Sequence, residues 1–258
     1  MILRRLTANL RAQNWTAITI EFFIVVIGVF IGTQVANWNE ARLAKVETKR
    51  MLEQLVPELR SQLEFFESVR TYYTTSRRFA DRALGAWNGD PDISDEQFVI
   101  AAYQASQISG IGTNAENWAL TFGGEQLRDM DDVKVRRNME IMLTADYSQV
   151  TLDAVATPYR EHVRRIIPIK VQDDIRRECG DRNIRGKAGF IVVVLPETCR
   201  LRIPSPEAAA IAASLRAEPK LVEELNWHLA AIAVFMSNVD ILEVPIRDLQ
   251  RDLTTLRS

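Results

Sequence analysis

Histidine and cysteine, the side chains most often used in acid–base, nucleophilic and metal chemistry, occur only four times in the 258 residues. His162 lies on a polar stretch of a predicted helix. His228 follows Trp227 on an apolar helix and is expected to be a hydrogen-bonded core residue. Cys179 and Cys199 lack the closely paired spacing typical of zinc sites, so we expect no metal and no cofactor.

Motifs for catalysis are equally scarce. Neither G-x-S-x-G nor H-E-x-x-H occurs in the chain. Residues 110–115 fit G-x-G-x-x-A, but they follow a helical stretch, whereas a pyrophosphate site needs a strand before the turn. We interpret this segment as a turn and predict that the protein is not an enzyme.

The clearest chemical feature is an apolar segment near the N-terminus. Residues 17–36 are 20 residues long, roughly the 30 Å of a bilayer core, and contain one charge, Glu21. Trp15 and Trp38 flank the segment, as interfacial anchors do. A cleaved signal peptide is the alternative, but the segment is longer than usual and residues 34–36 make a poor cleavage site. We therefore predict an uncleaved transmembrane helix over 15–38.

One face of this predicted helix carries Glu21, Gly28 and Gly32. Seven steps of 100° separate Glu21 from Gly28, so the two lie within about 20° of each other. Small residues four apart allow another helix to approach closely. We predict a docking face for another membrane protein or a second copy. The alternative is that small residues are simply frequent in spans and that Glu21 reaches interfacial water.

The flanks of the span leave its orientation open. Residues 1–14 are predicted to form a basic amphipathic segment on the cytoplasmic leaflet, although a frayed terminus is an equal alternative. Three basic residues precede the span and four follow it closely, which does not settle the positive-inside rule. A disulfide between Cys179 and Cys199 would contribute about 3 kcal/mol and would fit an oxidising periplasm. Two buried thiols in a cytosolic domain are the alternative.

Residues 39–258 are predicted to form one helical extramembrane domain. They hold 29 basic and 33 acidic residues, and the whole chain has a net charge of -2, which argues against a nucleic-acid partner. Residues 160–202 hold 11 basic and six acidic residues, which indicates either a patch for anionic surfaces or a solvated, partly paired loop region.

Helical spacing dominates this domain, so the predicted fold class is mainly α: a transmembrane helix followed by a helical bundle. A capping box at Ser94 and Gln97 predicts a helix through Gln107, and the last helix is expected over 220–256. One short β-hairpin near 190–203 is allowed, with a strand at 190–195 paired with 200–203.

The stretch Gln13–Asn14–Trp15 followed by VVIGVFIGTQVANWNEAR (25–42) resembles the start of an uncharacterised bacterial membrane-protein family. The resemblance is specific over about forty residues and looser at 118–147. It implies a bacterial inner-membrane protein with an N-terminal span and a helical domain of unknown function. The resemblance implies no molecular activity.

Together these features predict a single-pass signal-anchor protein with a cytoplasmic N-terminus and a periplasmic C-terminal domain. The expected function is interaction, as an accessory or scaffold subunit of an inner-membrane complex. The alternative is a periplasmic ligand-sensing domain that signals through a separate transducer.

Overall fold

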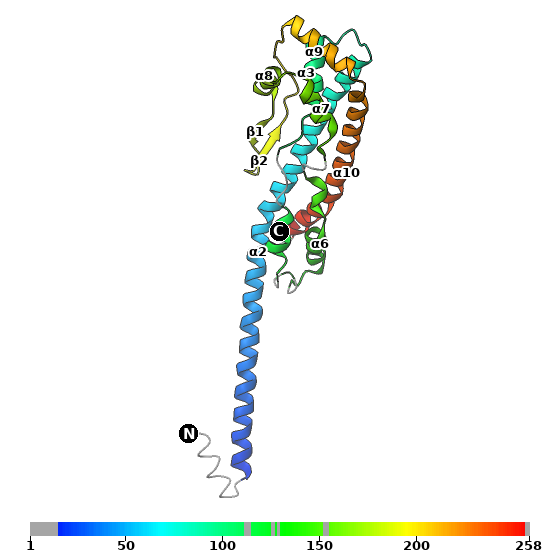
Figure 1. Cartoon of the computed structure of the whole chain (residues 1–258). Helices are drawn as coiled ribbons and strands as arrows, with labels where there is room; N and C mark the ends of the chain where they lie inside the picture. Colours follow the sequence, from blue (N-terminus) through cyan, green and yellow to red (C-terminus); the bar gives the residue numbers. More distant parts are fainter. Residues whose placement is uncertain (1–14, 111–114, 125–126, 128–129, 152–154, 256–258) are drawn as a thin grey trace.

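The computed structural model describes residues 15–110, 115–124, 127, 130–151 and 155–255 (Figure 1). One long helix, α2 (Trp15–Trp87), forms the axis of the molecule, and the other helices pack along its C-terminal half. The prediction of a mainly α protein with one short hairpin is confirmed. The predicted amphipathic segment 1–14 and the turn residues 111–114 lie outside the described residues.

Helix α2 has 73 residues, which gives a length of about 110 Å. It continues without interruption past residue 38, where the predicted span ends, and through Pro57. None of residues 39–50, here called the stalk, is buried, and regular burial begins at Met51. The same helix therefore supplies the predicted span, an exposed stalk and one wall of the bundle core.

The bundle consists of the C-terminal half of α2, a second long helix, α10 (Lys220–Thr255), and several short helices. In chain order its elements are α3 (Asp95–Ala105), η1 (Ala115–Asn117), α4 (Trp118–Phe122), α6 (Val133–Thr144), η2 (Tyr147–Val150), α7 (Pro158–Ile166), α8 (Ile169–Cys179), β1 (Arg182–Arg185), β2 (Ile191–Val194), α9 (Ser205–Ala217) and α10 (Lys220–Thr255). The central helix is α3, in which every residue from Phe98 to Ala105 is buried. The predicted capping box is present: Gln97 N–H donates to Ser94 Oγ, and Ser94 N–H donates to Gln97 Oε1.

Helix α10 runs antiparallel to α2. The Arg70 guanidinium donates to Asp240 and Glu243, with both Nη2–oxygen distances at 2.6 Å. The Tyr73 ring meets the Phe235 ring edge to face at 5.3 Å. Positions further along α2 thus meet positions earlier on α10, which places the end of α10 nearest the stalk (Figure 1).

The hairpin differs in its pairing from the prediction. Strand β2 coincides with the strand expected at 190–195, but it pairs antiparallel with β1, the segment before it, and not with 200–203. Residues 186–190 join the strands and include a turn at 186–189, in which Gly189 adopts a φ of +85° that is strained for residues with a side chain. The segment 200–203 is held elsewhere, because Cys199 is bonded to Cys179 of α8 and the Ile203 N–H donates to Glu96 of α3.

The hairpin turn is fastened to α2 by Glu64. This carboxylate accepts the backbone N–H of Lys187 and, at 2.7 Å, that of Ala188. A disulfide joins Cys179, the last residue of α8, to Cys199, and their Cα atoms are 5.1 Å apart. The covalent loop thus encloses both strands and holds the hairpin against the bundle.

Helix α8 was not expected from the sequence, because its charges obscured its apolar face. Val171, Ile175 and Cys179 recur at four-residue steps and are buried. The charged positions between them pair locally, as in the exposed ion pair of Arg177 with Asp174. Part of the basic 160–202 region is therefore an amphipathic helix and not a loop.

Candidate functional site

Two helices, α2 and α10, are long and apolar enough to cross a membrane by length and composition. In the N-terminal part of α2 the apolar window is not buried against any part of the protein, whereas α10 is partly buried in the bundle. The large apolar side chains left exposed within 20–35 are Ile20, Phe22, Phe23, Ile24, Val25, Val26, Ile27, Val29, Phe30, Ile31 and Val35. Leaving these side chains in water would cost on the order of 10 kcal/mol, so the segment needs an apolar surrounding.

The predicted docking residues lie on the exposed part of α2. The helix is regular from Glu21 to Gly32, so the shared face expected for Glu21, Gly28 and Gly32 follows from its geometry. A Cβ atom built on Gly28 or on Gly32 meets no other atom within 4 Å. The two glycines therefore form an open, shallow part of the helix surface that a second helix backbone could approach.

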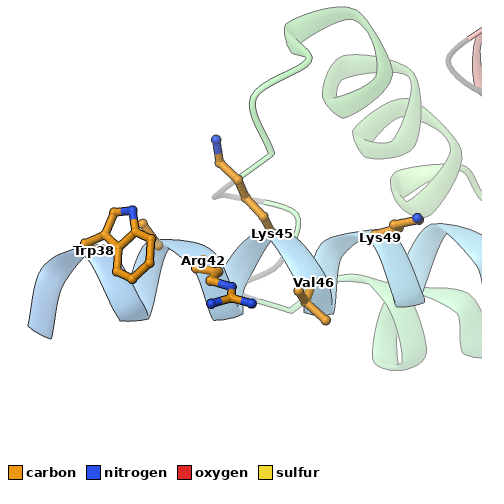
Figure 2. A pocket seen from close by; sticks show the side chains of 6 residues that line it. Trp38, Arg42, Lys45, Val46 and Lys49 are labelled. Atoms are coloured by element: carbon orange, nitrogen blue, oxygen red, sulfur yellow. The ribbon is translucent and has the colours of Figure 1, made fainter. Parts of the chain in front are cut away.

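A basic face follows the span directly. Trp38, 65% exposed, begins a row that continues along one side of the stalk through Arg42, Lys45 and Lys49 (Figure 2). These residues line an open hollow of about 460 Å³, and the Arg42 guanidinium lies 5.9 Å from the Trp38 ring centroid. An aromatic ring beside guanidinium and ammonium groups is the chemistry that suits a lipid headgroup region. One of these ammonium groups, that of Lys45, also pairs with Asp131 at 3.2 Å. From the sequence, the basic residues among these were interpreted only as charges bearing on the orientation of the span.

A second hollow, of about 470 Å³, lies beside the disulfide, between α2, α3 and the segment 197–202. Arg82, Arg200 and Arg202 contribute positive charge to its wall. Glu96 opposes them, because it lies 3.5 Å from Arg202 and also accepts the backbone N–H of Ile203. The lining is polar and of mixed charge, so the hollow suits a small polar molecule better than an apolar one.

The bundle core contains an extended polar cluster between α3 and α7. Arg164 donates to the Tyr103 hydroxyl at 3.0 Å and to Gln107 Oε1 at 2.9 Å, and its guanidinium stacks over the Tyr103 ring. Arg160 donates to the Ser106 carbonyl at 2.7 Å. Burial, and then the nearby Arg164 charge, lowers the pKa of Arg160. These contacts satisfy polar groups within the fold, so we assign them a structural role.

The two histidines lie in different surroundings. His228 has no exposed surface, and its Nδ1 is 2.7 Å from Thr157 Oγ1, as expected for a hydrogen-bonded core residue. His162 is partly exposed, with Nδ1 3.0 Å from Glu224 Oε2 and Nε2 3.6 Å from Glu218. The hydroxyl–imidazole pair of Thr157 and His228 resembles a nucleophile with its base, but the imidazole is fully buried. Among the described residues, no three His, Cys, Asp or Glu side chains gather as metal ligands would.

One exposed apolar surface was not predicted from the sequence. Helix α10 buries one apolar face in the bundle and leaves a second apolar face exposed, with Trp227, Val234 and Ile241 at seven-residue steps. That spacing is present in the sequence, but the buried residues of α10 are apolar too, so the sequence pattern does not distinguish the exposed apolar face from the buried one. The tertiary structure separates the two faces.

Comparison of the chain with protein-family models finds no match, and comparisons with curated proteins and with solved structures find none either.

Proposed function

We propose that this protein is a single-pass membrane-anchored interaction protein, an accessory or scaffold subunit of a bacterial inner-membrane complex. Its N-terminus is cytoplasmic and its helical domain periplasmic. Lipid surrounds residues 17–36, and the face of Glu21, Gly28 and Gly32 contacts another membrane protein or a second copy. This function uses no nucleic acid, metal or cofactor.

The continuity of α2 carries this proposal. The exposed apolar segment and the wall of the bundle core belong to one uninterrupted helix, joined by a stalk of 12 residues, about 18 Å long. A partner that binds the span is thereby connected to the domain by a stiff helix and not by a flexible linker. The basic, Trp-bearing face after residue 36 supports an interface at that level.

The disulfide supports the periplasmic placement of the domain. Cys179 and Cys199 are bonded, and bonds of this kind persist in oxidising compartments and are rare in the cytosol. A periplasm-active reporter fused after Ser258 should be active, and a cytosol-active reporter at the same position should be silent. The opposite pattern would overturn this topology.

Affinity purification of the full chain in mild detergent, followed by identification of co-purifying proteins, tests the docking face. The variant Gly28→Leu plus Gly32→Leu places side chains where the open surface lies and should lose the partner. Val26→Leu plus Phe30→Leu is the matched control, because Val26 and Phe30 lie about 160° and 200° from Gly28 around the helix. Equal partner recovery from both variants would rule out the glycine face.

The hollow beside the disulfide favours a second candidate, a ligand-sensing domain. Its three arginines and its polar lining suit a small anionic or zwitterionic molecule. A thermal-shift screen of the full chain in detergent should find a compound that raises the melting temperature, and Arg82→Gln should reduce that shift. A screen without any such shift would leave interaction as the supported function.

A further inference from the structure

The outer face of α10 forms a continuous apolar stripe. Trp227, Val234, Ile241 and Val244 are between 58% and 66% exposed, and the exposed small residues Ala230 and Ser237 lie between them. We call these six residues the α10 stripe. The helix buries its other face, where Ile232, Phe235 and Val239 pack in the core. A helix that is apolar on two sides is normally covered on both.

The spacing of the stripe is that of a two-helix seam. Trp227, Val234 and Ile241 occupy every seventh position, and Ala230, Ser237 and Val244 follow each of them by three. This is the a and d pattern of a coiled coil. Glu223 and Asp248 occupy the next seam positions on either side, so the apolar stretch has charged ends about 25 residues apart. The seam itself spans 227–244, about 25 Å of helix.

A bilayer that holds the span cannot also cover this stripe. Arg70 contacts Asp240 and Glu243, near the stripe end closest to the stalk. Arg70 lies 32 residues beyond Trp38 on an uninterrupted helix, which is roughly 48 Å along the axis. That separation exceeds the thickness of a headgroup layer several times over. The stripe therefore faces water unless a protein surface covers it.

We propose that the α10 stripe is a self-association surface occupied by α10 of a second copy of this chain, in parallel and in register. The direction rests on the proposed membrane anchor. Two copies anchored in one membrane are related by a twofold axis along the membrane normal, which keeps their α10 helices parallel. Each seam residue then meets its own equivalent, as Ile241 meets Ile241 and Val234 meets Val234.

The charges beside the seam are compatible with this arrangement. In a parallel pair, each residue at the g position faces the residue five positions later on the other helix. Asp240 then faces Pro245, and no like charges meet along 227–244. Asp252 takes no part, because its side chain is only 8% exposed and is bound by Lys134 and Asn138 of α6. Glu223 and Asp248 would each meet their own equivalents, so the contact ends inside these two residues. A two-helix contact about 25 Å long is at the small end of stable interfaces, but anchoring both copies in one membrane raises their effective concentration.

Cysteine cross-linking in native membranes tests the position and the direction together. The full chain with Ile241→Cys should give a dimer with a short bifunctional maleimide, whereas Leu120→Cys should not, although Leu120 is 89% exposed. An antiparallel pair would instead link Ala230→Cys to Ile241→Cys in a mixed sample and leave Ile241→Cys alone monomeric. That result, or equal cross-linking at Leu120 and Ile241, would overturn the proposal.

Substitution tests the energetics in the full chain. Val234→Glu plus Ile241→Glu places like charges in the seam and should weaken dimerisation by ~100-fold or more, measured by light scattering in detergent. Leu120→Glu plus Val133→Glu is the matched control, because Val133 is also exposed (64%) and neither residue belongs to α10. Helical circular dichroism shows whether each variant folds. A dimer that survives the stripe variant refutes the proposal.

These outcomes separate the further inference from the proposed function. If Gly28→Leu plus Gly32→Leu abolishes the dimer while the stripe variant leaves it intact, the span mediates association and the stripe does not. If the chain cross-links at Ile241 but is released from membranes by alkaline carbonate, the membrane anchor is wrong and the parallel direction loses its support.

Discussion

Acidification is expected to destabilise the bundle through one buried side chain, His228 on α10. It has no exposed surface. Its Nδ1 lies 2.7 Å from Thr157 Oγ1, and its ring centroid lies 5.8 Å from that of Tyr159. Burial lowers the pKa of His228 from 6.5 to about 4, because the imidazolium cation would lose its hydration in the core. The folded protein therefore keeps this ring neutral at pH values where the unfolded chain protonates it.

The magnitude follows from the two pKa values. Since the folded pKa is the lower one, stability is unaffected well above pH 6.5 and falls as the pH drops from 6.5 towards 4. The loss from this histidine is about 2 kcal/mol at pH 5. With a urea dependence of about 2 kcal/mol per molar, the unfolding midpoint falls by about 1 M between pH 7 and pH 5.

Urea unfolding of the full chain in mild detergent, followed by circular dichroism, measures this effect. His228→Gln keeps a hydrogen-bond acceptor near Thr157 but cannot titrate. The stability that this variant loses between pH 7 and pH 5 should therefore be about 2 kcal/mol smaller than the loss in the native chain. His162→Gln is the control, because it removes the other, partly exposed histidine. If His228→Gln and the native chain show the same pH dependence, the reasoning is refuted.

Two further perturbations test how the bundle is held together. Arg70→Met should lower the free energy of unfolding by about 2 to 3 kcal/mol, because it removes one cation from Glu243, whose side chain is only 8% exposed. The exposed contact with Asp240 adds little to that figure. Cys179→Ser plus Cys199→Ser should cost about 3 kcal/mol by releasing a covalent loop of about 20 residues. The same urea titration measures both.

Each of these has its own control. Arg77→Met removes an ion pair with Asp81 in which both side chains are more than half exposed, so its effect should stay below about 0.5 kcal/mol. If Arg70→Met lowers the free energy of unfolding by no more than this control does, the prediction that the Arg70–Glu243 ion pair stabilises the fold is contradicted. For the disulfide, the native chain treated with reductant should match the double serine variant. Unchanged stability under full reduction would contradict the prediction.

The sequence predicted most of the helices, because each carries its own local signals. The capping box at Ser94 and Gln97 marks the start of α3, and the long apolar pattern after residue 220 marks α10. Helix α8 was missed because charges occupy its exposed face and only three buried residues show the helical step. The pairing of β2 with β1 was missed because a strand pattern identifies a strand but not its neighbour.

The candidate sites show the same division. The exposed apolar segment of α2 and the shared face of Glu21, Gly28 and Gly32 follow from composition and helical geometry alone, since they need no packing partner within the chain. The hollow beside the disulfide could not be foreseen, because Arg82 and Arg202 are 120 positions apart and only the fold brings them together.

The sequence by itself determined that this chain is mainly helical and carries an apolar segment long enough for a membrane, because both properties reside in local patterns of side chains. Only the tertiary structure decided that α2 continues from that segment into the bundle core, and which face of α10 is buried. Both faces of α10 are apolar, so the periodicity of the sequence does not indicate which face is buried. Packing against Tyr73 and its neighbours on α2 selects one face and leaves the α10 stripe exposed.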